Sequence, residues 1–471
     1  MPNSPEPGTT RRSCGGCWLY GVVIFFGLPT LLLMTLALIF MGREQSARRQ
    51  LQAKLAERVA QNLPIDNATL GELHDRSTSA EDTAEWYAVL DVITSAEHEQ
   101  STKGVPTLDA SEGVSETFPA PGSDWPEQRA TLDFLEKWSD LEGKVHRLAS
   151  RQLTSGSTPV RFDIEFDSFD TILQHVQHMR SVARFVRVGG ERAVYFDQPD
   201  DLLRSIESLI GTSDTLRGDP FLVPQLVRIA IDGIAIELLQ KSLEHDVLGV
   251  PELQRLLPLM LTRTQIGNEW QLAIHGEIAG AMPAFAEPSR IDNEISVVLP
   301  ARSRDALMYL DHMTAILDVP VDDLTQFQTT CQALEDDLST KLYGGTLPNF
   351  DGILTGMMAP AIASAAEAFI RRVTLNRLAA IAVAIRLHRK QNGSFPESLD
   401  DLGPLGIDLK QLSPPGADRF GYAVDETGGV LWGYDFIREN AIPPTPPARP
   451  ADGEESYEAD MQRIWTWYLP D

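Results

Sequence analysis

The sequence predicts a mainly α-helical protein with an N-terminal transmembrane helix, a body of helical hairpins and a small C-terminal α+β unit made of a long helix and a β-hairpin. Residues 18–41 form a run of twenty-four residues without a charged side chain. Most later segments place apolar residues at helical spacing. Only residues 420–424 and 430–436 combine alternating apolar residues with an intervening turn, which predicts a hairpin.

The apolar run at residues 18–41 is long enough to cross a bilayer. At ~1.5 Å per residue it spans about 36 Å, against a hydrocarbon core of roughly 30 Å. A cleaved signal peptide has a shorter apolar core followed by a small-x-small site, whereas this run ends in Met41-Gly42-Arg43-Glu44. We therefore expect residues 18–41 to contact the lipid bilayer as a retained anchor.

The charges around the span give conflicting indications of its orientation. Arg11 and Arg12 precede it, and four basic residues follow it closely: Arg43, Arg48, Arg49 and Lys54. A positive-inside count places the residues that follow the span in the cytoplasm, but long domains translocate largely regardless of charge. We expect residues 1–17 to be a cytoplasmic tail, and the large C-terminal domain to be extracytoplasmic at the inner (cytoplasmic) membrane of a bacterium.

Charge is distributed unevenly along the 471 residues. Up to residue 60 there are seven Lys or Arg against three Asp or Glu, and afterwards 33 against 64. A body this acidic repels nucleic acid and anionic lipid. The sequence therefore predicts no nucleic-acid partner.

The segments after the span predict several helical regions. Residues 42–100 are expected to form juxtamembrane helices, where Leu51, Leu55 and Val59 make an apolar stripe that either pairs with a second copy or docks on the body. Residues 101–125 are rich in Ser, Pro, Gly and Thr, which is typical of a linker. Residues 126–350 are expected to form a helical extracytoplasmic domain.

Within that helical domain, three features are predicted. Residues 159–166 alternate as a short strand would, and residues 184–210 resemble a degenerate tetratricopeptide-type hairpin without a repeated period. The segment 221–243 is apolar nearly all round but is interrupted by four charged residues, Arg228, Asp232, Glu237 and Lys241. We expect it to be a core helix rather than a second span.

The C-terminal region carries a family resemblance. A helix over residues 357–391 ends at Asn392-Gly393, within the stretch LHRKQNGSFPESLDDL that precedes the predicted hairpin. Residues 351–440 resemble the soluble domain of a type II secretion pseudopilin. The whole chain resembles a group of uncharacterised, single-pass, mostly helical bacterial membrane-anchored proteins that end in the same unit. The resemblance implies that Phe395 packs the helix against the hairpin.

The N-terminal span differs from that of a pseudopilin, and a tail follows the pseudopilin-like unit. A pseudopilin joins this helix to its membrane segment and has a Glu near the start of the apolar run, whereas here Gly16-Cys17-Trp18 leads into a span without an acid. Residues 441–471 form a Pro-rich acidic tail with an aromatic end containing Trp465 and Trp467. That end is expected either to dock on the body or to bind a partner.

Candidate reactive residues do not form a complete motif. Cys14 and Cys17 are half of a metal or redox site, or lipidation sites, or simply small residues at the membrane edge. His175 and His178 could supply two zinc ligands with Glu165 or Asp167. Further potential ligands are His275, Glu277, Asp311 and His312. With no nucleophile-elbow or phosphate-loop motif, we expect no catalytic residue, no cofactor and no metal.

The functional prediction is a membrane-anchored interaction or scaffold protein of the cell envelope, without catalysis and with a possible protein partner. One alternative is a metal-dependent envelope hydrolase built around His175 and His178. Another is a component of a secretion system. The sequence specifies neither the partner nor the oligomeric state.

Overall fold

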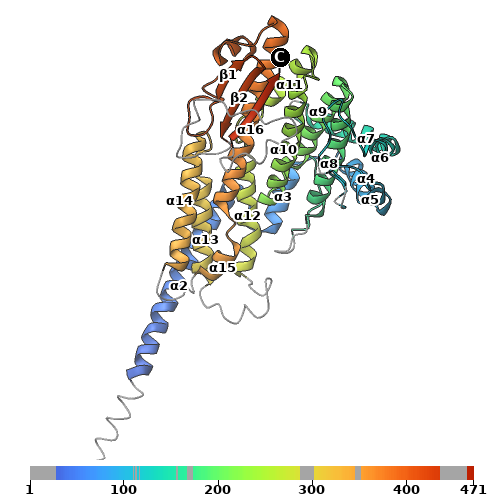
Figure 1. Ribbon diagram of the computed structural model, residues 1–471. Coiled ribbons are helices and arrows are strands. Elements are labelled where there is room, and N and C mark those ends of the chain that lie inside the picture. Colours follow the sequence, from blue (N-terminus) through green and yellow to red (C-terminus); the bar gives the residue numbers. More distant parts are fainter. Residues whose placement is uncertain are drawn as a thin grey trace, which may run out of the picture.

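The computed structural model describes residues 28–109, 111, 114–115, 117–154, 157–166, 173–286, 302–344, 352–434 and 464–470. These residues are mainly helical and include a small antiparallel three-stranded sheet (Figure 1), which confirms that part of the predicted fold class. Residues 18–27 of the expected span lie outside the described residues, as do Cys14 and Cys17.

The helices of the first half of the chain begin with a long one that projects away from the body (Figure 1). They are α2 (Leu28–Ala60), α3 (Asn67–Ser77), α4 (Thr83–Ile93), α5 (Ala96–Ser101), α6 (Gln128–Lys137), α7 (Ser139–Gln152), α8 (Gln174–Tyr195), α9 (Pro199–Thr215) and the 3-10 helix η2 (Leu216–Gly218).

The second half of the chain continues the helical body and ends in the sheet. Its elements are α10 (Leu222–Glu244), α11 (Val250–Leu261), α12 (Glu269–Ala286), α13 (Arg302–Leu317), α14 (Leu324–Tyr343), α15 (Ile353–Met358), α16 (Ile362–Asn392), the 3-10 helix η6 (Leu399–Leu405), β1 (Gly421–Asp425), β2 (Gly428–Tyr434) and β3 (Ile464–Pro470).

Local sequence signals explain several of these boundaries. Asp66 and Thr69 form a reciprocal capping box at the start of α3, and Asp323 accepts two backbone N–H groups at the start of α14. Helix α16 ends where Gly393 takes a left-handed φ of 78°. That conformation carries little steric cost only for a residue without a Cβ, as the sequence predicted.

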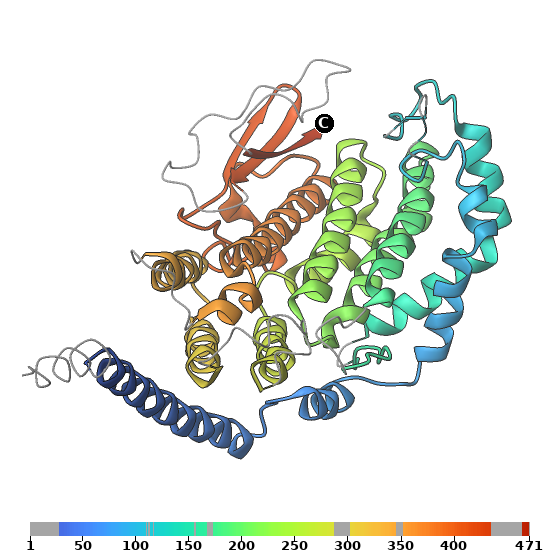
Figure 2. The same ribbon diagram turned by 90° about the horizontal axis from the view of Figure 1, so that it is seen from below.

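Two hydrophobic cores lie within the body, and α16 passes through both. One core contains α12 to α15 and the first half of α16, where Phe369 is fully buried. The other contains most of α4 to α11, the sheet and the second half of α16, where Leu378 is buried. Figure 2 shows α2 and the sheet on opposite sides of the central helices. Because α16 is shared, the expected boundary between residues 350 and 351 does not separate two independent domains.

The region expected to be a linker, residues 101–125, packs on the body instead. Val105, Phe118 and Trp125 are buried in the second of these cores. The Trp125 ring lies 4.8 Å from the Tyr195 ring, measured between centroids. The Ser, Pro and Gly content correctly indicated irregular backbone, but three apolar side chains stabilise it against the helices.

The strand expected at residues 159–166 is not formed. Val160 makes only an isolated parallel bridge with Ser79. Phe162 is fully buried and stacks on His175 with 4.6 Å between ring centroids. The alternation therefore reflects two buried side chains, Val160 and Phe162, that pack between helices rather than in a sheet.

The C-terminal sheet has the order β1-β2-β3 and is antiparallel throughout. The predicted hairpin is present, and the aromatic end of the tail adds a third strand in which Leu431 pairs with Trp467. Trp467 is fully buried, so this part of the range 441–471 docks on the body and belongs to the preceding unit. Phe395 packs beside β2, close to Gly429, in the place expected for it.

One helical stretch among the described residues, Ile353–Asn392, is long and apolar enough by composition to cross a membrane. It is interrupted between Met358 and Ile362, where α15 ends and α16 begins. Its side chains from Phe369 to Leu387 are buried almost without exception. In this fold the stretch is therefore the central core helix.

Candidate functional site

A cleft of about 910 Å³ opens beside the boundary between the two cores. The loops after α7 and between α11 and α12 contribute much of its lining, together with residues from α3, α7, α9, η2, α10, α11, α12 and α16. Its charged lining consists of five arginines and three carboxylates: Arg217, Arg228, Arg255, Arg263, Arg372, Glu207, Asp214 and Glu269. None of the described residues that line it is aromatic.

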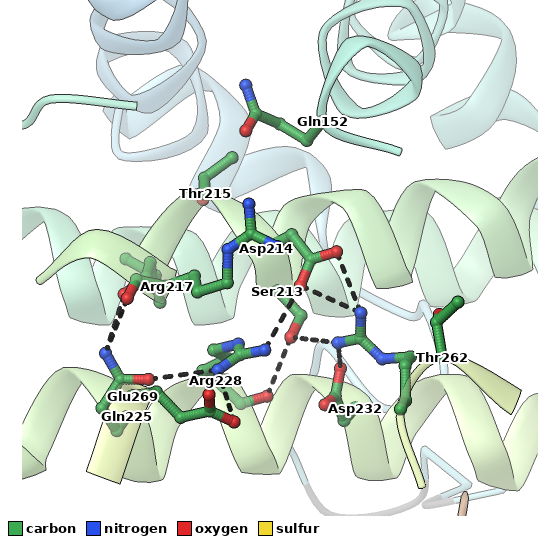
Figure 3. A network of polar contacts seen from close by, with 12 residues as sticks. Gln152, Ser213, Asp214, Thr215, Arg217, Gln225, Arg228, Asp232, Thr262 and Glu269 are labelled. Carbon is green, nitrogen blue, oxygen red and sulfur yellow. Dashed lines mark hydrogen bonds and ion pairs between the residues drawn. The ribbon is translucent and has the colours of Figure 1, made fainter. Parts of the chain in front are cut away.

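The floor of the cleft is a buried network of charges (Figure 3). Helix α10 supplies Arg228 and Asp232 at i, i+4, which places both on one face. The network joins α9, α10, α12, α16 and the turn after α11 through three arginines and three carboxylates: Arg228, Arg263, Arg372, Asp214, Asp232 and Glu269. Each of these six residues is at most 8% exposed.

Asp232 is the centre of this network. Arg263 Nη2 donates to its Oδ1 at 2.6 Å, and Arg372 Nε donates to its Oδ2 at 2.8 Å. Arg263 Nη1 also reaches both carboxylate oxygens of Asp214 at 2.9 Å, and Arg372 Nη1 donates to Glu269 Oε1 at 2.6 Å. Short charge-assisted hydrogen bonds of this kind are the strong ones.

The arginines hold these carboxylates in their charged form. Burial raises the pKa of Asp232, but the charges of Arg263, Arg372 and Arg228 outweigh burial and lower it to about 2. Burial likewise opposes ionisation of Glu269, yet Arg228 and Arg372 bring its pKa to about 2. The neighbouring arginines therefore favour the charged form of both Asp232 and Glu269.

Arg228 is the least satisfied member of the network. It is 3% exposed, but its contacts to Gln225 Oε1, Asp214 Oδ1 and Glu269 Oε1 are 3.3, 3.4 and 3.4 Å long. Its Nε has no hydrogen-bond partner among the described residues. Burial, followed by the nearby charge of Arg372, lowers the pKa of Arg228.

The histidines proposed as zinc ligands do not converge. Buried His175 contacts Asp219 Oδ2 through its Nε2 at 2.8 Å, and the Nε2 of His74 lies 3.5 Å from Asp219 Oδ1. Burial raises the pKa of Asp219, but the hydrogen bonds from His175 and His74 lower it overall. His178 is not part of this contact, Glu165 is on the segment before α8, and Asp167 lies outside the described residues.

The other potential ligands are also dispersed. His275 accepts a hydrogen bond at its Nδ1 from Arg58, and a carboxylate oxygen of Glu277 accepts the backbone N–H of Leu222. Asp311 pairs with Lys54, and His312 lies on the same helix, α13. Across the described residues, no group of three or more His, Cys, Asp or Glu side chains is arranged to hold a metal ion.

The polar cleft was not predicted from the sequence. The one available signal was the i, i+4 pair Arg228 and Asp232 inside an otherwise apolar helix, which indicates a buried ion pair with partners on other elements. The partners are far along the chain, with Arg372 lying 140 positions after Asp232. No local pattern connects them.

Comparison with known proteins adds no relative, since no family model, curated protein or solved structure matches the chain. The functional argument therefore depends on the geometry of this molecule. The cleft offers fixed positive charge and hydrogen-bond donors, which is an arrangement suited to binding an anion.

Proposed function

We propose that the chain is a single-pass membrane protein of the bacterial cell envelope, whose helical body acts by binding or scaffolding rather than by catalysis. The observation that carries the proposal is the contrast between the two halves of α2. Its first half is apolar and exposed, and its second half is docked on the body.

The first half of α2 has the surface of a lipid-facing helix. Leu31 and Leu33 are each 66% exposed, and Leu36 is 52% exposed. The other large apolar side chains up to residue 41 that are exposed are Leu32, Met34, Leu38, Ile39 and Met41. An apolar surface of this extent is rarely left in water, and together with residues 18–27 it has the length of a span.

The second half of α2 is fixed to the body by apolar and polar contacts. Leu51 and Leu55 pack against one core, whereas Val59 is 52% exposed, so the expected stripe docks through its first two members. Glu44 Oε1 accepts the N–H of Ser303 at 2.9 Å, which caps the start of α13. This packing supports docking within one chain over pairing with a second copy, and it supports a body held rigidly beside the bilayer.

The C-terminal unit supports a scaffold more than a secretion-system subunit. In a pseudopilin the long helix continues into the membrane segment. Here α16 is enclosed by α10, α11 and α14. Its apolar surface is already used inside the body, so it is not available for a pilus-like assembly.

Alkaline carbonate extraction of membranes tests the anchor. The wild-type chain is expected to stay in the membrane pellet, and the double change Leu33→Arg and Leu36→Arg is expected to release it. Each arginine near the middle of a span costs about 2.5–3.5 kcal/mol of insertion free energy. Val59→Arg is the matched control, because Val59 is equally exposed on the same helix but lies beyond the span.

Protease accessibility in spheroplasts tests the address of the body. Digestion of the body from outside, with a cytoplasmic marker intact, is the expected result. In the carbonate experiment described above, release of the wild-type chain from the membrane pellet would contradict the anchor. Protection of the body until lysis would place it in the cytoplasm and overturn the envelope address alone.

A further inference from the structure

The cleft reverses the charge balance of the body around it. Beyond residue 60 the chain has 33 basic against 64 acidic residues. Around the cleft, five arginines face three lining carboxylates and the buried Asp232. A local excess of positive charge in a strongly acidic protein attracts an anion to this place.

Two of the five arginines, Arg217 and Arg228, have no short contact to a carboxylate among the described residues. Arg263 and Arg372 are held by contacts of 2.6–2.9 Å, and Arg255 pairs with both carboxylate oxygens of Glu207 at 2.7 and 2.8 Å. The contacts of Arg228 are all 3.3 Å or longer. Within the described residues Arg217 forms no ion pair and donates only to the carbonyl of Ser157, at 2.8 Å.

A single buried side chain, Gln225, links the Arg228 guanidinium to the backbone of Arg217. Gln225 accepts from Arg228 Nη1 at 3.3 Å and donates through Nε2 to the backbone carbonyls of Leu216, Arg217 and Asp219. Gln225 is 1% exposed, so its position is fixed. Figure 3 shows Arg217, Gln225 and Arg228 on the same side of the network.

The shape of the cleft restricts the ligand. Its volume of about 910 Å³ suits a small molecule rather than a protein segment. Without an aromatic side chain among its described lining residues, it offers no platform for stacking a base. Two guanidinium groups match the several oxygens of a phosphate better than the two of a carboxylate.

We infer that this cleft binds a small soluble molecule carrying a phosphate group, with Arg217 and Arg228 as the residues that bind the phosphate. The unsatisfied donors of the two arginines supply hydrogen bonds to its oxygens. Lining residues such as Leu153, Leu259 and Leu272 contact the rest of the molecule. The inference does not depend on the membrane anchor.

Equilibrium dialysis of the purified full-length chain against radiolabelled inorganic phosphate, at constant ionic strength, tests the site. Saturable binding of one phosphate per chain is expected. Arg217→Gln is expected to weaken it roughly tenfold or more, the usual effect of losing a charged hydrogen bond. Arg217 is partly exposed, so its loss leaves the buried network intact.

Arg147→Gln is the matched control. Arg147 is exposed on α7 and, like Arg217, donates to a backbone carbonyl, that of Gly143. It is not among the lining residues. Unchanged binding in this variant supports the site. Absence of saturable binding up to about 10 mM phosphate, or equal binding by wild type and Arg217→Gln, would overturn the inference.

Discussion

Helices α2 and α16 are the two longest helices among the described residues, and their surroundings are opposite. Leu33 and Leu36 of α2 face outward, whereas Ile381 of α16 is fully buried. Helix α16 carries Arg372, Arg377 and Arg386 inside the body, each with a hydrogen-bonded partner. The first half of α2, up to residue 42, has no charged side chain. Hydropathy alone therefore does not separate a buried core helix from an apolar helix with exposed side chains, whereas internally paired charges mark the buried one.

The largest expected effect comes from removing a paired charge of α16. Arg372→Met removes the closest partner of buried Glu269 and one of the two close partners of buried Asp232, which costs about 3–5 kcal/mol of unfolding free energy. Denaturant unfolding of the full chain in detergent measures it. Arg129→Met, at a side chain that is 94% exposed on α6, is expected to change little. A loss as small as that of Arg129→Met would mean that the network does not stabilise the fold.

Shortening one apolar side chain to alanine on each of the two helices gives the next largest difference in unfolding free energy. Ile381→Ala removes buried methyl groups from a core and is expected to cost about 2–5 kcal/mol. Leu36→Ala, on the exposed half of α2, is expected to stay within about 0.5 kcal/mol in the same unfolding assay. Equal losses at the two positions would show that the first half of α2 also packs against protein.

The smallest expected change in unfolding free energy comes from His275, which contacts the docked half of α2, and this change depends on pH. Burial and the adjacent Arg58 lower the pKa of His275 from 6.5 to about 4, so the folded protein holds this ring neutral. A pKa depressed on folding contributes stability above pH 6.5, and that stability is lost as pH falls towards 4.

Unfolding at pH 7 and pH 5 measures this contribution. Wild type is expected to lose about 1–2 kcal/mol more than His275→Gln between the two values, because only wild type must protonate the ring on unfolding. An identical pH dependence in both proteins would rule out His275 as its source. Asp232 and Glu269, with pKa values of about 2, do not titrate in this range.

The parts of the fold that sequence reasoning predicted are those with local causes. The long helix before Gly393, the turn at Phe395 and the strands on either side of Asp425 depend on neighbours within a few residues. Strand β3 was not foreseen as a strand, because residues 435–463 separate it in sequence from its partner, β2. The aromatic residues did indicate that this segment would not remain in water.

The polar cleft was beyond prediction for the same reason. Asp232 meets Arg263 across 31 positions and Arg372 across 140. A single charge in an apolar helix indicates that a partner exists, but it does not identify that partner. The partner of His175, a residue considered only in the alternative of a zinc site, was equally out of reach, because Asp219 lies 44 positions away.

The docking of α2 onto α13 must wait until α13 has been synthesised. The cap between Glu44 and Ser303 joins residues 259 positions apart, and Arg58 meets His275 across 217. At a synthesis rate of about 5–20 residues per second, the docking face of α2 waits roughly 13–50 s for α13 to be made. During that interval Leu51 and Leu55 have no partner surface on α13, so this apolar face of α2 stays uncovered while the rest of the body is made.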